Sequence, residues 1–443
     1  MTTLLPGAGS RPRAGSVAGR GRTPASGLGR RLGNRLAVWE TPVTSYYLLL
    51  GSALVLVAIG LVMVLSSSSV TAIADSGSAF SVFLRQAVFA AVGLPVMWLC
   101  SRMPVAWWKA LAWPLVLLAV LGQLLVFTPL GKGVNGNLNW IEIGGVTAQP
   151  SEGAKLALAL WCAVVLSRKA PLLHRWQHVI IPVAPVAGLV LALVLLGKDL
   201  GTGLVMMMLI GVVLYVAGVR LRMFALVGAA AAGLAAGLVV TSPNRMQRVQ
   251  TWFSGECADI YGACWQSTHG KWALASGGWW GLGLGASREK WSWLPEAHND
   301  YIYAIIGEEL GLPGTLAVLG LLAALCLGGL RVMLRHEDPF VKIATAGVLA
   351  WVIGQALVNI AVVLGLLPVI GVPLPLVSSG GSALIATLAA VGMVLSFARS
   401  EPGAPDALAA RAGVVRRSLA VVGSRGTATG GPAVRGSASR SRR

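Results

Sequence analysis

The sequence predicts an all-α polytopic membrane protein with about ten transmembrane helices. Hydrophobic residues make up 56% of the 443 residues and the mean hydropathy is +0.74, which is too apolar for water-soluble domains. Ten segments reach or approach the roughly 20 consecutive apolar residues that a helix needs to cross a bilayer. Polar, basic ends flank these segments, so the expected membrane domain covers residues 44–402.

The ten apolar segments are joined by short connections, with one exception. The segments are 46–66, 82–100, 108–128, 153–167, 179–196, 201–218, 223–241, 310–330, 343–364 and 376–398. The fourth, fifth and sixth are short, so nine or eleven helices are also compatible with the sequence. The exception is the connection between the seventh and eighth helices, residues 242–309, which forms one large loop.

Both ends of the chain have the composition of disordered tails. Residues 1–43 and 403–443 are rich in Gly, Ser, Pro, Ala and Arg, and such segments bury too little apolar surface to fold. The tails carry about +13 of the formal net charge of +19. Binding to anionic membrane lipid explains this charge more simply than binding to nucleic acid, so no nucleic-acid partner is expected.

The distribution of charge predicts the orientation in the membrane. Ten helices place both tails on one side, and the short loops on that side hold ten Lys or Arg residues against four in the short loops opposite. By the positive-inside rule both termini are cytoplasmic and the 242–309 loop is extracytoplasmic. Of the acids outside the tails, only Glu337 and Asp338 face the cytoplasm. Ionisable chemistry is therefore expected on the outer face.

Two external helix starts carry charged residues. Pro150, Ser151 and Glu152 have the composition of a helix N-terminus, with Lys155 one turn further on. Glu152 and Lys155 form either an ordinary i,i+3 ion pair or part of a substrate-binding site. Asp199 lies in the turn "GKDLGTG", where it either marks the membrane surface or takes part in function beside apolar spans.

The large loop contains candidate cysteine and anion sites. Cys257 and Cys264 face an oxidising compartment and are predicted to form a disulfide, since no familiar spacing of metal ligands is present. Arg245 and Arg248 would suit an anionic group such as a diphosphate, or they are simply solvated charges. The chain has no Walker motif, so an external reaction needs a substrate that arrives already activated.

The stretch "LPEAHNDYIYAIIGEELG", residues 294–311, concentrates acids just outside the eighth span. A helix starting at Asn299 as cap would place Asp300 roughly 13 to 15 Å outward of the span, where water reaches it. Asp300 either stabilises that helix terminus or acts as a general base. In the second case the neighbours that adjust its proton affinity are His298, Glu296 and Glu308.

Five motifs resemble the SEDS proteins, the shape, elongation, division and sporulation family, over residues 44–402. They are "QPSEGAKLAL", "KDLGTG", "SPNRMQR", "LPEAHNDYIYAIIGEELG" and "GLLPVIGVPLPLVSSGGSALI". The resemblance, which is greatest to the division proteins of actinobacteria, implies a SEDS-type fold. It also implies a peptidoglycan glycosyltransferase that polymerises lipid II on the outer face of the bacterial cytoplasmic membrane at the division septum. The implied partners are a class B penicillin-binding protein and other divisome proteins.

The resemblance also assigns roles to residues. The family's essential Asp lies in a His-Thr-Asp-Phe motif that falls on "HNDY", so Asp300 would deprotonate the attacking sugar hydroxyl and undecaprenyl diphosphate would leave. Glu152, Lys155 and Asp199 match cavity residues of the family. In this chain Asn299 replaces the usual Thr, and both residues can cap a helix.

Several alternatives remain at this point. A lipid II flippase, an elongation-type polymerase of the same family and a divisome scaffold acting through the basic tails all fit the sequence. No resident metal site is expected, and dependence on a divalent cation such as Mg²⁺ or Mn²⁺ stays open.

Overall fold

The structure is a computed structural model that describes residues 41, 43–134, 136–173, 175–254 and 264–410. The chain divides into two compact units, Met1–Thr41 and Pro42–Arg443, and the helices and strands of the described residues belong to the second. Most of both predicted tails lies outside the described residues. Residues 404–410 are helical and Ala404 is buried, so ordered chain continues beyond the predicted boundary at residue 402.

Ten long helices of the described chain occupy the ten apolar segments that the sequence predicts. They are α2 (Thr44–Ser76), α3 (Ser81–Arg102), α4 (Val105–Leu125), α5 (Pro150–Arg168), α6 (Trp176–Leu196), α7 (Leu200–Val216), α8 (Leu221–Val240), α11 (Ile302–Arg335), α12 (Pro339–Val363) and α13 (Gly381–Arg399). Seven helices in the described ranges are long and apolar enough to cross a membrane. The remaining three, α5, α7 and α8, are separate helices, so the fourth to seventh segments are not merged or split.

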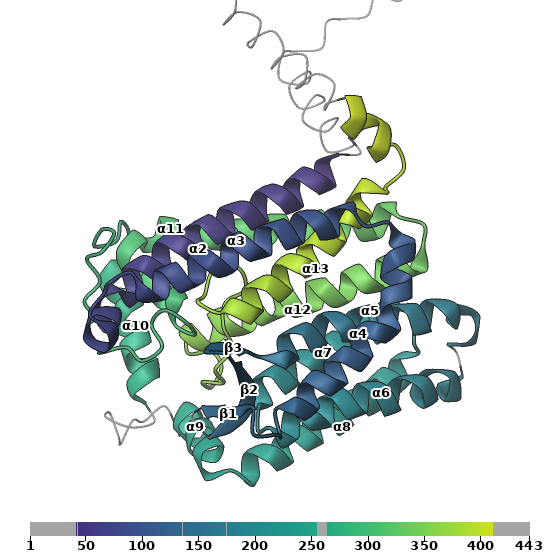
Figure 1. Cartoon of the computed structure of the whole chain (residues 1–443). Helices are drawn as coiled ribbons and strands as arrows, with labels where there is room; N and C mark the ends of the chain where they lie inside the picture. The colour runs from purple at the N-terminus through teal and green to yellow at the C-terminus, as the bar shows by residue number, and fades with distance from the viewer. Residues whose placement is uncertain (1–40, 42, 135, 174, 255–263, 411–443) are drawn as a thin grey trace, which may run out of the picture. The chain divides into compact units, whose positions relative to one another are not determined.

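The outer connections contain a small sheet and two more helices (Figure 1). Strands β1 (Gly131–Val134), β2 (Asn137–Ile143) and β3 (Val146–Ala148) form an antiparallel sheet, and α9 (Pro243–Ser254) and α10 (Trp265–Gly277) lie in the large loop. The all-α prediction did not include this sheet. Its strands are only 4, 7 and 3 residues long, too short for a clear alternating pattern, and its turns depend on positive-φ glycines.

Helix α11 is broken where the membrane span meets the outer segment. Gly311 has φ 65° and ψ −159°, a backbone conformation that only glycine adopts readily. A Cβ atom at Gly311 would lie 2.4 Å from the backbone nitrogen of Gly281, so this position also needs the small residue for close approach. The break separates residues 302–310 from the span, whereas the sequence predicted one continuous helix.

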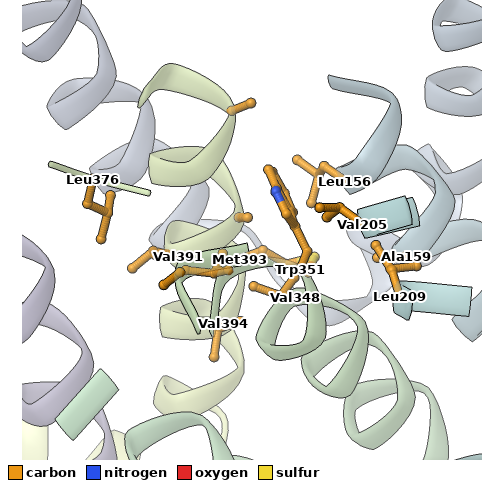
Figure 2. Close-up of a cluster of buried hydrophobic side chains, with 14 of the residues drawn as sticks. Leu156, Ala159, Val205, Leu209, Val348, Trp351, Leu376, Val391, Met393 and Val394 are labelled. Atoms are coloured by element: carbon orange, nitrogen blue, oxygen red, sulfur yellow. The ribbon is translucent and has the colours of Figure 1, made fainter. Parts of the chain in front are cut away.

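The core of the helical domain is centred on α12. Trp351 is fully buried, and Figure 2 shows its ring between Leu156 and Val205 on one side and Met393 on the other. These contacts join α12 to α5, α7 and α13. Because lipid is as apolar as the core, close packing and satisfied hydrogen bonds stabilise such a bundle more than hydrophobic burial does. The Trp351 indole N–H is satisfied by Gln355 Oε1 at 3.1 Å, and this bond links the core to the polar residues above it.

Candidate active site

Asp300 lies in the turn directly before α11. The residue is partly exposed, but its Oδ1 atom is buried and has no hydrogen-bond partner among the described residues. Its Oδ2 atom faces the backbone of Gly371, where a Cβ atom would come within 3.4 Å. The prediction of a freely water-accessible side chain is therefore wrong in part. The carboxyl group is enclosed on one side, and one oxygen is left without a donor.

The surroundings of Asp300 raise its pKa from 3.8 to about 7. Burial is the main cause, and the carboxylates of Glu296 and, more weakly, Asp199 add to it, while the Arg248 guanidinium acts in the opposite direction. A pKa near 7 suits a general base, because about half of the groups are ionised at neutral pH and each ionised group still binds a proton well. Helix-terminus stabilisation, the alternative role, is not supported, since α11 begins two residues later at Ile302.

Hydrogen bonds from two side chains to backbone carbonyl groups hold the Asp300 segment in place. Asn359 of α12, which is 2% exposed, donates through Nδ2 to the carbonyl oxygens of Asp300 and Val372, both at 2.7 Å. Ser378 Oγ donates to the carbonyl of Asn299 at 2.7 Å. The connection between α12 and α13, residues 364–380, is thus fixed to the segment that carries Asp300.

The predicted cap at Asn299 is wrong. Helix α11 begins at Ile302 with Tyr301 at the N-cap position and no side-chain cap. The Asn299 side chain instead donates to Glu296 Oε2 at 3.3 Å. The carbonyl of the preceding residue, His298, accepts from the backbone N–H of Ser379 at 3.0 Å. The sequence change from Thr to Asn at position 299 therefore does not act through helix capping.

Asp199 caps α7, a role that neither of the two interpretations from the sequence included. Its Oδ1 accepts from the backbone N–H of Thr202 at 3.0 Å, and its Oδ2 accepts from Asn139, Gln149 and Thr202 side chains, each at 2.9 Å. These four hydrogen bonds join Asp199 at the start of α7 to β2 and to the residue before α5.

Glu152 and Lys155 form the i,i+3 ion pair that was one of the two interpretations of their spacing. Lys155 Nζ lies 2.8 Å from Glu152 Oε1 and 2.9 Å from Gln355 Oε1, and it stands 4.9 Å from the centroid of the Trp351 ring. Both charged side chains are at most 4% exposed. Glu152 Oε2 is buried without a partner among the described residues, so the pair retains one free acceptor.

Arg245 and Arg248 extend from α9 toward the outer ends of other elements. Arg245 Nη2 donates to the Lys198 carbonyl at 2.5 Å, and Arg248 Nη1 donates to the Val369 carbonyl at 3.3 Å. Each guanidinium has five N–H donors, and these bonds use only a few of them. Arg248 is close enough to Asp300 to oppose the rise of its pKa. The structure thus brings one of the two predicted anion-binding arginines to the candidate base.

Glu308 and Glu309 hold the glycine-rich part of the large loop. Glu308 accepts from Ser287 Oγ at 2.5 Å and from the backbone N–H of Arg288 at 2.8 Å, and it is fully buried. Glu309 accepts from Ser66 Oγ at 2.6 Å and lies 3.4 Å from Lys290 Nζ. The sequence placed Glu308 with the substrate-binding residues and near Asp300. In the structure its carboxylate is enclosed by the loop, and it is not among the causes of the pKa shift.

The structure describes only one of the two cysteines of the predicted disulfide. Cys264 is buried and disulfide-bonded, and Cys257, its predicted partner, lies outside the described residues. His269, which lies in α10 of the same loop, pairs with Glu289 Oε2 at 2.6 Å. In the described part of the chain, no group of three or more His, Cys, Asp or Glu side chains is arranged to hold a metal ion.

Three uncharged side chains of the site were not among the candidate residues named from the sequence. Asn359 and Gln355 lie one turn apart on α12, and Gln149 precedes α5. Each donates to a group of the site, namely the Asp300 carbonyl, the Pro373 carbonyl and Asp199 respectively. An amide within an apolar helix is the only feature that could have singled out Asn359 and Gln355.

The geometry described above can be compared with known proteins. A sequence model of the family described as cell cycle protein, which covers FtsW, RodA and SpoVE, matches residues 46–402. The chain belongs to this family. These are the SEDS proteins that the five motifs indicated.

Several members of the family are similar to this chain in sequence, and some solved structures are similar to it in fold. The chain is 40% identical over 378 residues to the "Probable peptidoglycan glycosyltransferase FtsW" of Mycobacterium tuberculosis, covering 85% of this chain and 72% of the relative. It is 35% identical over 349 residues to stage V sporulation protein E of Bacillus subtilis, covering 78% and 94%. The fold matches RodA of Thermus thermophilus with a TM-score of 0.60 at 28% identity, over 80% of this chain and 97% of that one.

A second solved structure that resembles this chain is part of a protein complex. A chain from the structure titled "Structural coordination of polymerization and crosslinking by a peptidoglycan synthase complex" matches with a TM-score of 0.64 at 28% identity. The match covers 79% of this chain and 96% of that chain. The fold of this SEDS member is therefore the one found in a complex that couples polymerisation to crosslinking.

Proposed function

We propose that this SEDS protein is a peptidoglycan glycosyltransferase of the FtsW type that polymerises lipid II during septal wall synthesis. The observation that carries the proposal is Asp300, a carboxyl group with one unpartnered oxygen and a pKa of about 7, held at the outer end of the helices beside Arg248. Relatives named as FtsW glycosyltransferases support the reaction class. The similarity to these relatives favours this class over a flippase or a scaffold.

In the proposed reaction Asp300 acts as general base. It takes the proton from a sugar hydroxyl of the acceptor as that oxygen bonds to the anomeric carbon of the donor. The bond between this carbon and the diphosphate oxygen breaks, and undecaprenyl diphosphate leaves with the electron pair. Because the donor is already activated, the reaction needs no nucleotide.

The cations and acids around Asp300 receive distinct roles in this proposal. Arg245 and Arg248 bind the donor diphosphate and stabilise the charge of the leaving group, since guanidinium groups pair well with phosphate oxygens. Glu296 and His298 lie on the rim and contact the sugar. The Glu152 and Lys155 pair supports the site from below through Gln355.

A divalent cation enters the proposal only with the substrate. We expect Mg²⁺ or Mn²⁺ to bind, where activity requires it, as the counter-ion of the lipid diphosphate with one or two carboxylates. No step of the reaction above is assigned to it. Chelation is therefore expected to alter the Michaelis constant for lipid II more than the turnover number.

The proposal includes orientation and partners. We expect both termini in the cytoplasm and Asp300 on the outer face, where lipid II is used, because Lys and Arg are in excess in the tail-side loops. A class B penicillin-binding protein is the expected partner at the septum, as the structural relative belongs to a complex that also crosslinks. Other divisome proteins and the membrane lipids complete the expected surroundings.

The test is polymerisation of lipid II by the purified full chain with its transpeptidase partner. Asp300→Asn keeps the size of the side chain and removes the base, so polymer is expected to fall below one hundredth of the wild-type amount. Asp406→Asn, an exposed carboxylate in the C-terminal segment, is the matched control and is expected to leave activity unchanged. Full polymerisation by Asp300→Asn would sink the proposal. Loss of lipid II translocation in liposomes with normal polymer length would indicate a flippase instead.

A further inference from the structure

A cavity lies at the opposite end of the helices from Asp300. It has a volume of about 470 Å³ and lies between the N-terminal ends of α6 and α8. Arg175, Trp176, Gln177, Arg220 and Met223 line it. Helix α6 has 21 residues and is therefore about 30 Å long, and it ends next to the Lys198 and Asp199 turn of the outer face. The cavity thus belongs to a different membrane surface and not to the candidate active site.

The cavity concentrates positive charge from two separate parts of the chain. Arg175 and Arg220 come from different connections, and each occupies the N-cap position of its helix. Neither helix has a side-chain cap, so the first backbone N–H groups of both helices lack that partner. The positive ends of two helix dipoles therefore add to two guanidinium groups at one place.

The chain segments that carry the two arginines contain no charged group of opposite sign near them in sequence. The sequence has no Asp or Glu between Glu152 and Asp199, nor between Asp199 and Glu256, and Asp199 lies at the other end of α6. Among the described residues, neither arginine takes part in an ion pair. The positive-inside rule accounts for arginines in these connections, but it does not require two of them to line the same cavity.

The edge of the cavity is apolar. Trp176 is 54% exposed and the neighbouring Leu221 is 68% exposed, both at the ends of apolar helices. An indole at such a position is typical of the boundary between lipid headgroups and acyl chains. A ligand that fits both parts carries an anionic group for the arginines and an apolar chain for this edge.

We propose that this cavity binds the phosphate group of an anionic phospholipid from the leaflet opposite Asp300, which the predicted orientation makes the cytoplasmic leaflet. Basic pockets between transmembrane helices on this side are suited to anionic headgroups, and guanidinium groups bind phosphate oxygens in a bidentate manner. The lipid links the starts of α6 and α8, the two helices that flank α7 and its Asp199 cap. Free inorganic phosphate offers the same group without the chain, and the experiment separates the two.

The experiment measures lipid binding by native mass spectrometry of the detergent-solubilised full chain. The protein is titrated with phosphatidylglycerol, with phosphatidylcholine and with inorganic phosphate. The double variant R175Q/R220Q removes the cavity's charges, and R168Q/R222Q removes the same number of exposed charges from the same face outside the cavity. We expect R175Q/R220Q to bind phosphatidylglycerol about tenfold more weakly, and R168Q/R222Q to remain within about twofold of wild type.

The other outcomes overturn the proposal. Equal weakening in both double variants would mean that diffuse surface charge attracts the lipid. Equal binding of phosphatidylglycerol and phosphatidylcholine by the wild type would show that the site does not select a headgroup with a net negative charge. If inorganic phosphate displaces the lipid and Trp176→Ala has no effect on phosphatidylglycerol binding, the ligand of the cavity is a free anion and not a phospholipid. The single variants R175Q and R220Q, each expected to weaken binding by about threefold, provide the test if the double variant fails to fold.

Discussion

The raised pKa of Asp300 makes the rate of polymerisation depend on pH near neutrality. If the ionised carboxylate is the base, about one tenth of the enzyme is active at pH 6 and about nine tenths at pH 8, so the rate rises about tenfold across this range. The midpoint is expected near pH 7. The assay is the initial rate of lipid II polymerisation at saturating substrate from pH 5.5 to 8.5.

Two neighbours of Asp300 provide a matched pair of perturbations. Glu296→Gln removes a charge that raises the pKa of Asp300, so the midpoint moves to lower pH. Arg248→Gln removes a charge that lowers this pKa, so the midpoint moves to higher pH. Each shift is expected to be at most about one pH unit, since both partners are near solvent. A flat profile, or the same midpoint in all three proteins, would refute the assignment of Asp300 as the titrating base.

The same shift has a consequence for stability. Because the pKa of Asp300 is raised in the folded protein, the folded state binds a proton that the unfolded state releases between about pH 4 and pH 7. The free energy of unfolding therefore falls as the pH rises through this window, by at most about 4 kcal/mol. The Asp300→Asn variant has no carboxyl group to ionise, so its free energy of unfolding does not fall in this way. It is expected to unfold at a higher temperature than wild type at pH 8 and at a similar temperature at pH 4. Equal unfolding temperatures at pH 8 would contradict a carboxyl group whose pKa is raised in the folded protein.

Three further substitutions test the supports of the site. Asn359→Ala leaves the buried carbonyls of Asp300 and Val372 without their donor, so it lowers the free energy of unfolding by about 2 to 4 kcal/mol. In polymerisation assays it lowers kcat more than it raises KM, with the pH midpoint retained. Glu309→Ala leaves Lys290 unpaired in a buried place and is expected to be more destabilising in thermal unfolding than Glu309→Gln, which keeps an acceptor for Ser66. Gly371→Ala introduces a side chain at φ 68° beside Asp300 Oδ2, so it lowers both stability, by about 1 kcal/mol, and kcat.

The helices could be predicted because each one carries its own signal. Length and apolar composition locate a membrane span without reference to the rest of the chain, and all ten predicted segments are helices. The sheet at 131–148 has no such signal, since its pairing depends on turns with positive-φ glycines and on a bond from Leu138 to the Gly197 carbonyl. The start of α11 was misplaced for a similar reason. The Asn299 carbonyl bonds to Ser378, 79 residues away, and this bond holds the residue outside the helix.

The candidate site could be predicted only in its charged members. Asp300, Asp199, Glu152 and Lys155 stand out because ionisable groups beside apolar spans are rare. Asn359 donates to a carbonyl 59 residues away, and only the folded chain brings the two together. Helical spacing predicts the direction in which each acidic side chain points, but it does not predict which group that side chain contacts. It placed Glu308 near Asp300, whereas the structure commits Glu308 to the loop at Ser287.

The acids at the start of α11 divide into two kinds by their partners. Glu308 and Glu309 are buried with donors and fix the loop at 281–290, whereas Asp300 has an oxygen without any donor among the described residues. The chain around Asp300 is held through backbone carbonyls, which do not change with protonation. The side chain can therefore gain and lose a proton without releasing the bonds that hold its segment. A base that also carried the structural hydrogen bonds would loosen its own site at each proton transfer, and this separation avoids that conflict.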